Sequence, residues 1–278
     1  MHKESNIKII CLDLDGTLLN SDKQLSPRNA AALERAAAAG AEIVPTTGRF
    51  FTGMPQFIQD LPYLHYAITI NGAQVYDIRK DCAVARNEMP LETALRILEY
   101  LDDQPVAYDC YQDNWGWMSR RFWEHIEDYT PDPHYHEMVH RLRTPLDDLK
   151  TTLRERGKDV QKLQAFIPDI SIKAQLIADL SAAFPEAAVT TSVPNNIEIN
   201  DRNCHKGAAL RQLADYLGVP IGQTAAFGDG SNDTTMIREA GKGVCMANGC
   251  EASLAAADII APDCDEDGVA KVLEQMGF

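Results

Sequence analysis

Two carboxylates lie close together where a short apolar segment ends. Asp13 and Asp15 follow residues 7–12, and a run this short and this rich in isoleucine predicts a buried strand. Side chains two positions apart on a strand share a face, so both carboxylates point the same way, and Gly16 lets the chain turn after them. Because neighbouring carboxylates repel each other, a hard cation such as Mg²⁺ is the simplest partner that keeps both ionised. The segment predicts either such a site or an acidic turn at a strand end.

A second acidic loop follows another apolar segment. Residues 228–233 read Gly-Asp-Gly-Ser-Asn-Asp, and the apolar run 224–227 in front of them predicts a strand. Asp229, Asn232 and Asp233 offer oxygen atoms of the kind that Mg²⁺ binds, and the glycines let the backbone approach closely. An acidic glycine-rich turn is common on its own. Together with the first acidic pair, it favours a metal site built from two strand ends.

Hydroxyl and amino groups complement the acids. Thr46 and Thr47 precede Gly48 and could donate to a phosphoryl oxygen, although threonines at such a place also cap helices. Lys206 stands at the expected start of a helix and could set a positive charge against a phosphoryl group, although most lysines are simply solvated. Two acids, a hydroxyl, a lysine and a second acidic loop, in this chain order, form a more specific pattern than any member alone.

These residues require a sheet whose strands end at one edge. Ser26 and Pro27 predict a helix start, and the alanine-rich segment after them ends at Gly40. Short strands are predicted at 41–44 and 67–70, each followed by polar residues or glycine. Strands that alternate with helices at this spacing predict an α/β fold, a Rossmann-like parallel sheet with helices on its faces. Ligands of such sheets bind at the carboxyl ends of the strands, where the motifs lie.

The middle of the chain has a different composition. It holds all three Trp and most of the His, and it predicts an inserted α+β cap domain at 84–189 within a core of 1–83 and 190–278. The apolar periodicity of 91–101 predicts a helix, and Ser171 is the expected cap of another. In the insertion, strands are expected at 108–118 and 160–167 and a helix at 171–184; in the resumed core, a strand at 197–199 and a helix at 206–217.

Composition disfavours several classes of partner. The formal net charge of −15 repels polyanions, which disfavours nucleic acid and anionic membranes but not a small phosphorylated metabolite bound beside a metal ion. No apolar run is long enough to span a bilayer, and the first residues do not resemble a signal peptide. The 7 cysteines are scattered, without a Cys-x-x-Cys pair, which predicts free thiols and a cytoplasmic protein.

The complete set of motifs resembles that of the haloacid dehalogenase superfamily of phosphohydrolases. Four motifs match in order and type: Asp13-Leu14-Asp15-Gly16-Thr17, Thr47 before Gly48-Arg49, Lys206, and Gly228-Asp229 with Asn232-Asp233. The insertion is similar in size and position to a type 2 cap. The chain further resembles the Cof-type subfamily, subclass IIB with a C2B cap, in Asn71-Gly72-Ala73, Ile197-Glu198-Ile199, Asn248, Ala257-Asp258 and Asp267-Gly268.

This resemblance implies a Mg²⁺-dependent phosphatase that hydrolyses a small organophosphate, a sugar phosphate or a phosphorylated cofactor. Asp13 is implied as the nucleophile that forms an aspartyl-phosphate, and Asp15 as the general acid and base. The implied Mg²⁺ ligands are Asp13, the backbone carbonyl of Asp15, Asp229 and, through water, Asp233. The implied phosphate-binding residues are Thr47, Gly48, Asn71, Lys206 and Asn232.

Several alternatives stay open at this point. Thr46 stands where the family more often has a small apolar residue, so either threonine could be the donor, and the position next to Gly48 favours Thr47. A phosphomutase or phosphotransferase would use the same intermediate. A non-catalytic phosphate-sensing protein would use the same scaffold, but the intact pair of Asp13 and Asp15 disfavours it.

Histidines in the insertion could form a second metal site. His134, His136 and His140 lie close in sequence, and two of them at a spacing of two residues could bind Zn²⁺. No cysteine or acid at ligand spacing completes the site. A polar surface of the cap is therefore the favoured interpretation.

Overall fold

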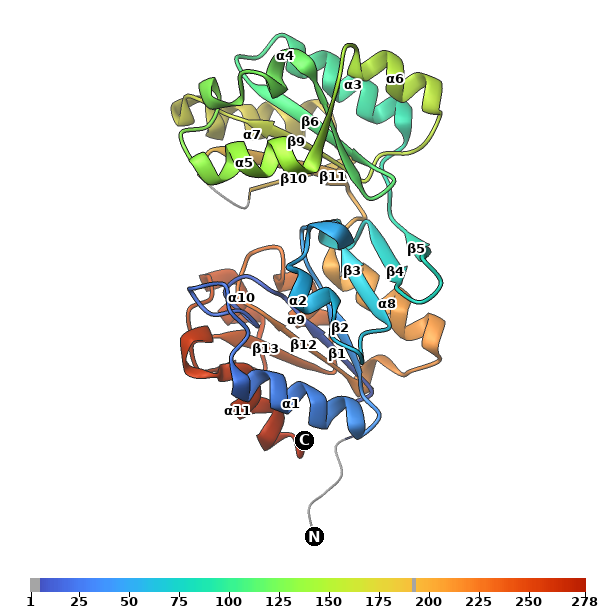
Figure 1. Ribbon diagram of the computed structural model, residues 1–278, viewed down its shortest axis with the longest axis vertical. Helices are drawn as coiled ribbons and strands as arrows, with labels where there is room; N and C mark the ends of the chain where they lie inside the picture. Colours follow the sequence, from blue (N-terminus) through green and yellow to red (C-terminus); the bar gives the residue numbers. More distant parts are fainter. Residues whose placement is uncertain (1–5, 192–193) are drawn as a thin grey trace. The chain divides into compact units, whose positions relative to one another are not determined.

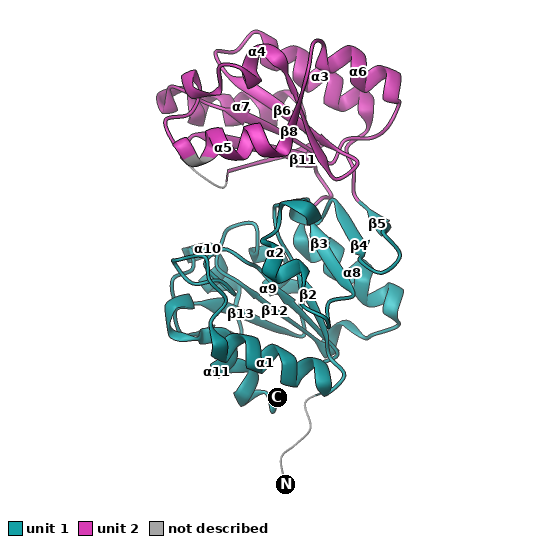
Figure 2. Ribbon diagram, viewed as in Figure 1, with its two compact units in different colours: residues 1–86, 205–278 teal, residues 87–204 magenta. Residues whose placement is uncertain are grey.

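The computed structural model describes residues 6–191 and 194–278, and its helices and strands are labelled in Figure 1. The chain divides into two compact units (Figure 2). Unit 1 runs to Arg86 and resumes at His205, and unit 2 comprises Asn87–Cys204.

Unit 1 is built on a five-stranded parallel sheet in the order β14-β13-β12-β1-β2. Its strands are β1 (Ile9–Leu12), β2 (Glu42–Pro45), β12 (Thr224–Gly228), β13 (Lys242–Met246) and β14 (Ile259–Ala261). Every residue of β1 is buried, which explains its unbroken apolar run. The parallel sheet confirms the predicted α/β fold class. Because β1 pairs with β12, the two acidic loops follow neighbouring strands.

Helices cover both faces of this sheet. They are α1 (Pro27–Ala38), α2 (Gln56–Gln59), α8 (Lys206–Leu217), α9 (Thr234–Glu239), α10 (Glu251–Ala256) and α11 (Gly268–Gln275). Ile10 and Leu12 of β1 pack in one core cluster with α1 and α11. Ile9 and Cys11 pack in another with α8 and α9. Asp13 stands two positions beyond Cys11, so alternation directs it toward the side of α8.

The predicted third strand belongs to a separate sheet. β3 (Tyr66–Thr69) pairs antiparallel with β4 (Gln74–Asp77), which pairs antiparallel with β5 (Cys82–Arg86). Two isolated parallel bridges, Ile43 with Leu64 and Thr46 with Ile68, connect the β3 region to β2. The strand therefore still ends at the same edge of unit 1 as β1 and β2, where a turn, η2 (Ile70–Gly72), follows it.

Unit 2 is a six-stranded sheet in the order β10-β11-β9-β6-β7-β8, antiparallel except between β7 and β8. Its strands are β6 (Ala107–Gln112), β7 (Trp115–Ser119), β8 (Arg143–Leu146), β9 (Lys162–Phe166), β10 (Ala187–Thr190) and β11 (Asn196–Asp201). Its helices are α3 (Leu91–Asp102), α4 (Arg120–Trp123), α5 (Pro133–Leu142), α6 (Leu149–Arg156) and α7 (Lys173–Ala183). The segment expected as one strand at 108–118 is a hairpin of two, β6 and β7.

The point at which the chain returns from unit 2 to unit 1 lies after the expected boundary at 189/190. The strand expected at 197–199 in the core is β11, which pairs with β9 and β10 of unit 2. Its apolar Ile197 and Ile199 alternate with polar residues such as Glu198, as in an antiparallel sheet with two distinct faces. The chain consequently returns to unit 1 at His205. At the first crossing, β5 pairs with β4 and extends unit 1 to Arg86, beyond the expected residue 83.

The predicted cap of α7 is wrong. The helix begins at Lys173, and a 3₁₀ turn, η4 (Ile170–Ile172), precedes it. Asp169 is the residue that caps this turn, because its side chain accepts the N–H of Ser171 at 2.9 Å. An aspartate two residues earlier competes successfully with the serine for the capping position.

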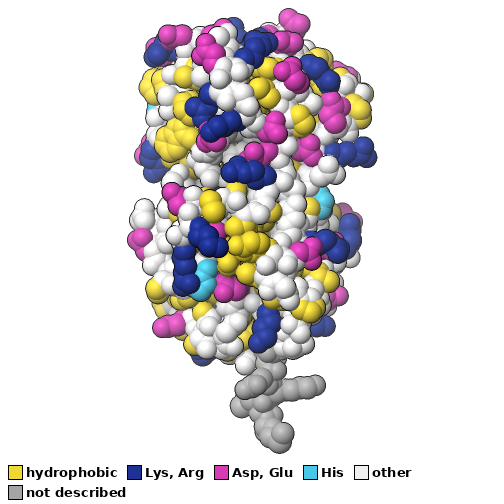
Figure 3. All heavy atoms as spheres, turned by 90° about the vertical axis from the view of Figure 1, so that its right-hand side faces the viewer, with side chains coloured by type: hydrophobic (Ala, Val, Ile, Leu, Met, Phe, Trp, Pro, Cys, Tyr) yellow, Lys and Arg dark blue, Asp and Glu magenta, His cyan; other side chains and the backbone are white. Residues whose placement is uncertain are grey.

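The surface carries charges of both signs. Acidic and basic side chains are interspersed on the face turned to the viewer in Figure 3. Among residues 6–191 and 194–278, no helix has the length and apolar character needed to cross a membrane. The 7 cysteines are free thiols, as predicted, and only Cys82 and Cys250 among them are exposed.

Candidate active site

Three carboxylates meet beyond the ends of β1 and β12. Oxygen atoms of Asp13, Asp229 and Asp233 lie within 4.8 Å of one another. The N–H of Asp13 donates to the carbonyl of Phe227 at 2.9 Å, which ties the two strand ends together. Asp13 and Asp233 are buried, and Asp229 is half-buried. The two acidic loops identified in the sequence thus form one cluster.

Lys206 is completely buried among these acids. Its Nζ donates to Asp13 Oδ1 at 2.6 Å and to Asp233 Oδ1 at 2.5 Å. The residue opens helix α8, with His205 as the N-cap. Gly72, at φ +101°, lets the turn after β3 approach this helix start, since a Cβ there would lie 2.6 Å from the carbonyl oxygen of His205. The helix start and the adjoining turn together fix the lysine.

The cluster carries more negative than positive charge. Three carboxylates and one ammonium group leave two negative charges when all are ionised. Burial raises the pKa of Asp13 to about 8 against the attraction of Lys206, and burial raises the pKa of Asp229 to about 6. Burial alone would lower the pKa of Lys206, but the attraction of its two carboxylate partners raises it. A divalent cation fits this site because it supplies the missing charge to oxygen ligands.

Asp15 lies apart from the cluster. Its Oδ2 accepts a hydrogen bond from Arg49 Nη2 at 2.7 Å, and its Oδ1 lies 3.2 Å from Lys23 Nζ. Burial by itself would raise the pKa of Asp15, but Arg49 and Lys23 bring it below its ordinary value. The carboxylate is therefore ionised at neutral pH, and it does not join the described carboxylates that could hold a metal. A metal contact through its backbone carbonyl stays a prediction.

Short contacts fix the two acidic loops against each other. Thr17 Oγ1 donates to Asp229 Oδ1 at 2.7 Å. Asp229 Oδ2 lies against Gly16, at φ +86°, where a Cβ would be only 2.6 Å away. Within the second loop, Asp233 Oδ2 accepts the N–H groups of Asp229 and Gly230 at 3.0 and 2.8 Å. One oxygen of Asp233 therefore shapes the loop, while the other binds the buried lysine.

The structure distinguishes the two threonines at the end of β2. Thr46 Oγ1 donates to the carbonyl of Val44 at 3.1 Å, and its side chain is fully buried. Thr47 Oγ1 accepts the N–H of Arg49 at 3.2 Å, which leaves its hydroxyl hydrogen for another acceptor. Thr47 remains the predicted donor to phosphate, and Thr46 is engaged with the sheet.

Thr47→Val is expected to lower kcat/KM about 10²-fold, because removing one preorganised donor from a transition state has an effect of this size. Thr46→Val is the matched control, with the same substitution one position away, and its activity is expected to stay near that of the wild type. Steady-state kinetics of both purified variants with p-nitrophenyl phosphate test this. Equal losses in the two variants would contradict the assignment.

Asn71 joins the remaining predicted residues. It lies in η2 at φ +57°, a left-handed conformation that asparagine tolerates better than most residues. Its N–H donates to the carbonyl of Thr47 at 3.0 Å, and its Oδ1 accepts a hydrogen bond from Asn232 Nδ2 at 3.1 Å. Gly48 lies beside it, since a Cβ there would be 3.0 Å from Asn71 Oδ1. Thr47, Gly48, Asn71 and Asn232 therefore lie together, and their roles toward phosphate stay predictions.

Three contacts of the site were not predicted from the sequence. Arg49 and Lys23 pair with Asp15, and Thr17 binds Asp229. Arg49 and Thr17 stand inside the motifs that carry the family resemblance, so their positions were a usable signal. Lys23 lies in a loop without such a signal, because its pairing depends on how residues 16–25 fold back.

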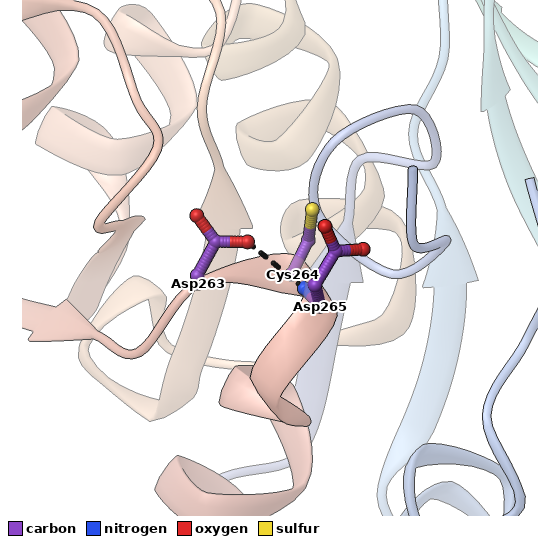
Figure 4. Close-up of side chains that lie close together, drawn as sticks. All are labelled: Asp263, Cys264 and Asp265. Atoms are coloured by element: carbon purple, nitrogen blue, oxygen red, sulfur yellow. Dashed lines mark hydrogen bonds between the residues drawn. The ribbon is translucent and has the colours of Figure 1, made fainter. Parts of the chain in front are cut away.

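A further acidic group lies at the start of η6 (Cys264–Glu266). Asp263, Cys264 and Asp265 lie close together, and the side chain of Asp263 accepts the N–H of Asp265 at 2.9 Å (Figure 4). The two oxygens of Asp265 accept the N–H and the hydroxyl of Ser21, each at 2.7 Å. These bonds account for the group as a turn that anchors the loop around Ser21.

Two histidines of α5, His136 and His140, lie within hydrogen-bond distance of backbone carbonyls. His136 Nε2 lies 2.7 Å from the carbonyl oxygen of Thr130, and His140 Nε2 lies 2.9 Å from that of Trp123. The side chain of His134 lies outside the described part of the structure. Within that part, the groups of three or more potential metal ligands do not include these histidines.

Comparison with known proteins identifies the family. A family model described as haloacid dehalogenase-like hydrolase matches residues 10–273. The chain belongs to the haloacid dehalogenase-like hydrolases. It is 28% identical to the 5-amino-6-(5-phospho-D-ribitylamino)uracil phosphatase YcsE of Bacillus subtilis (strain 168), over 98% of this chain and 96% of that protein. It is also 28% identical to the pyridoxal phosphate phosphatase YbhA of Escherichia coli (strain K12), over 96% of this chain and 97% of that protein.

Solved structures of the family agree with this assignment. The crystal structure of a haloacid dehalogenase-like hydrolase from Bacteroides thetaiotaomicron has a TM-score of 0.82 and 26% sequence identity, over 97% of this chain and 99% of that chain. These comparisons confirm the resemblance predicted from the motifs, including the Cof-type subfamily. They also confirm the prediction that the chain is a phosphatase of this family.

Proposed function

We propose that this family member is a Mg²⁺-dependent phosphatase that hydrolyses a small organophosphate through an aspartyl-phosphate on Asp13. The observation that carries the proposal is the cluster of three carboxylates around the single buried Lys206, an excess of acidic oxygen ligands that a divalent cation would balance. The family membership supports the same reaction class.

The proposed reaction has two steps, both at phosphorus. In the first, the Asp13 oxygen that does not accept from Lys206 attacks phosphorus, the bond to the leaving oxygen breaks, and Asp15 gives that oxygen a proton. In the second, water attacks the aspartyl-phosphate, Asp15 takes a proton from the water, and phosphate leaves with Asp13 regenerated. Lys206 and Thr47 would stabilise the phosphoryl oxygens in both steps.

The residues that would hold the cation are Asp13 and Asp229 directly, with Asp233 through water and the backbone carbonyl of Asp15. A bound Mg²⁺ screens the attacking carboxylate from the negative charge of the phosphate. The contacts of Thr17 and Gly16 with Asp229 support this role, because they hold one ligand in place before the ion arrives.

Asp15 must be protonated for the first step, although Arg49 and Lys23 lower its pKa in the resting protein. The negative charge of an incoming phosphate group raises the pKa of a neighbouring carboxylate and competes for the same cations. Substrate binding would thus convert Asp15 to the acid form that the first step requires. The ionised form is the base that the second step requires.

The proposed substrate class is a small phosphorylated metabolite, either a sugar phosphate or a phosphorylated cofactor. The two named relatives act on phosphate esters of small heterocyclic compounds, by their names, and this supports a compact substrate that carries one phosphate ester. The net charge of the chain supports the same choice over a polyanionic polymer.

Removing the metal is expected to abolish phosphate release. The measurement is inorganic phosphate released from a panel of sugar phosphates, nucleotides, pyridoxal 5′-phosphate and flavin mononucleotide, with Mg²⁺ and with a chelator. We expect release from at least one compound with Mg²⁺, none above background with chelator, and recovery when Mg²⁺ is added in excess. Release that persists in chelator would contradict the proposal. Transfer of phosphate to an added alcohol instead of water would favour a phosphotransferase.

A further inference from the structure

Asn248 lies on the turn between β13 and α10 and connects two other segments of unit 1. Its Nδ2 donates to the carbonyl of Gly16 at 2.8 Å, and its Oδ1 accepts the N–H of Cys264 at 3.1 Å. The side chain is exposed, so water could satisfy its amide equally well, and burial does not explain the two bonds. They link the turn after Asp15 to the C-terminal segment of the core.

The turn that carries Asn248 also binds the second acidic loop. The N–H of Cys250 donates to the carbonyl of Asp229 at 2.8 Å. The hydroxyl of Ser253 donates to the carbonyl of Gly230 at 2.6 Å. Residues 248–253 therefore bind backbone carbonyls of both acidic loops.

Gly16 is the point in the first loop where a restraint has most effect. Its φ of +86° and its missing Cβ leave its backbone more freedom than that of any neighbour. The carbonyl that Asn248 binds belongs to the peptide between Gly16 and Thr17, and Thr17 in turn binds Asp229. Rotation of this peptide would move Asp15 on one side and the hydroxyl of Thr17 on the other.

We propose that Asn248 is a positioning residue for the phosphatase reaction, which holds the Gly16 turn so that Asp15 can deliver its proton to the leaving oxygen. This inference rests on the proposed function. Asn248 touches neither the reacting atoms nor the carboxylates, and it acts only through the carbonyl of Gly16.

The test compares two leaving groups. Pyridoxal 5′-phosphate releases an alkoxide that needs a proton, whereas p-nitrophenyl phosphate releases a phenolate that leaves without one. Asn248→Leu is expected to lower kcat/KM about 10-fold with the first compound and about twofold or less with the second. A misplaced general acid slows the reaction only when the leaving oxygen needs a proton. Asn20→Leu is the matched control: it removes the bond from the N–H of Gln24 to Asn20 Oδ1 in the same loop without touching Gly16.

A second readout does not depend on turnover. Amide hydrogen exchange of the resting protein is expected to become faster in residues 15–19 of Asn248→Leu and to stay unchanged there in Asn20→Leu. Equal losses with both compounds, or unchanged exchange in residues 15–19, would overturn the positioning role. Wild-type protein that releases phosphate from neither compound and from no other member of the panel would count against the proposed function, and the exchange result would still decide the role of Asn248.

Discussion

Asp13→Asn is expected to abolish phosphate release, with a loss on the order of 10⁴-fold or more, because an amide cannot replace the attacking carboxylate. The fold is expected to persist. Burial raises the pKa of Asp13 to about 8, so the folded protein already disfavours the charged form, and a neutral side chain of the same shape costs it little. The variant retains an oxygen that can accept from Lys206 Nζ, as Asp13 Oδ1 does at 2.6 Å.

Three measurements test this expectation together. Phosphate release gives the loss of activity, and a thermal melt gives the stability, which should not fall below that of the metal-free wild type. Rapid acid quench with labelled substrate should trap a phosphorylated wild-type protein and no phosphorylated Asp13→Asn. Residual turnover above about a hundredth of the wild-type rate in a folded variant would refute the nucleophile role.

Lys206→Met is expected to cause the second largest loss, about 10²–10³-fold in kcat, because it removes a buried cation from the phosphoryl site. It is also expected to destabilise the metal-free protein by about 3 kcal/mol, since breaking a buried ion pair leaves an uncompensated charge. Lys206 is completely buried between Asp13 and Asp233, so no water can take its place. Methionine fills a similar volume, and the effect is therefore one of charge rather than packing.

The stability loss in Lys206→Met should depend on pH. Without the attraction of the lysine, the pKa of Asp229, which burial already raises to about 6, rises further, so the folded variant holds a proton that the folded wild type and the unfolded state release. Stability relative to the wild type therefore falls as the pH rises from about 6 to 8. Chemical denaturation of both proteins in chelator at the two pH values measures this. A deficit that is equal at both values would mean that packing, not charge, causes it.

An exposed lysine provides the control for this experiment. Lys80 pairs with Asp77 at 3.1 Å on the surface of unit 1, away from the cluster. Lys80→Met removes the same charge from the chain, but Lys80 is exposed, and Asp77 keeps the N–H groups of Arg79 and Lys80 as donors, so the loss should stay within about 0–1 kcal/mol. We expect near wild-type stability and activity from it, which would exclude net charge alone as the cause of the Lys206 effect.

The features that were predicted most accurately are the strands and helices that local sequence patterns determine. The parallel core followed from short apolar runs separated by helix signals, and helix α8 begins at the predicted residue, Lys206. The acids met as expected because parallel strands end at one edge of a sheet. Chain order and residue type were enough to predict that Asp13, Asp229 and Lys206 lie together.

Features that depend on contacts between distant segments were not predictable in this way. Asp15 turns toward Arg49 and Lys23, which requires knowing how two separate loops fold back on the first strand. The strand at 197–199 could not be assigned to a unit from its own residues, because pairing with β9 decides it. The sequence identified Asn248 only as part of the family pattern. Its hydrogen bond to Gly16 joins residues 232 positions apart and was not predicted.

The strand order of unit 1 has a consequence for how the protein is made. β1 lies between β2, which follows it closely in the chain, and β12, which is synthesised only after the whole of unit 2. A nascent chain can therefore pair β1 with β2 early, while the other edge of β1 waits, open to wrong pairing, until residues 224–228 leave the ribosome. A chain that stops within unit 2 carries Asp13 but neither Lys206 nor the second acidic loop. The active cluster is thus completed only near the end of synthesis, and prematurely terminated chains carry no assembled site.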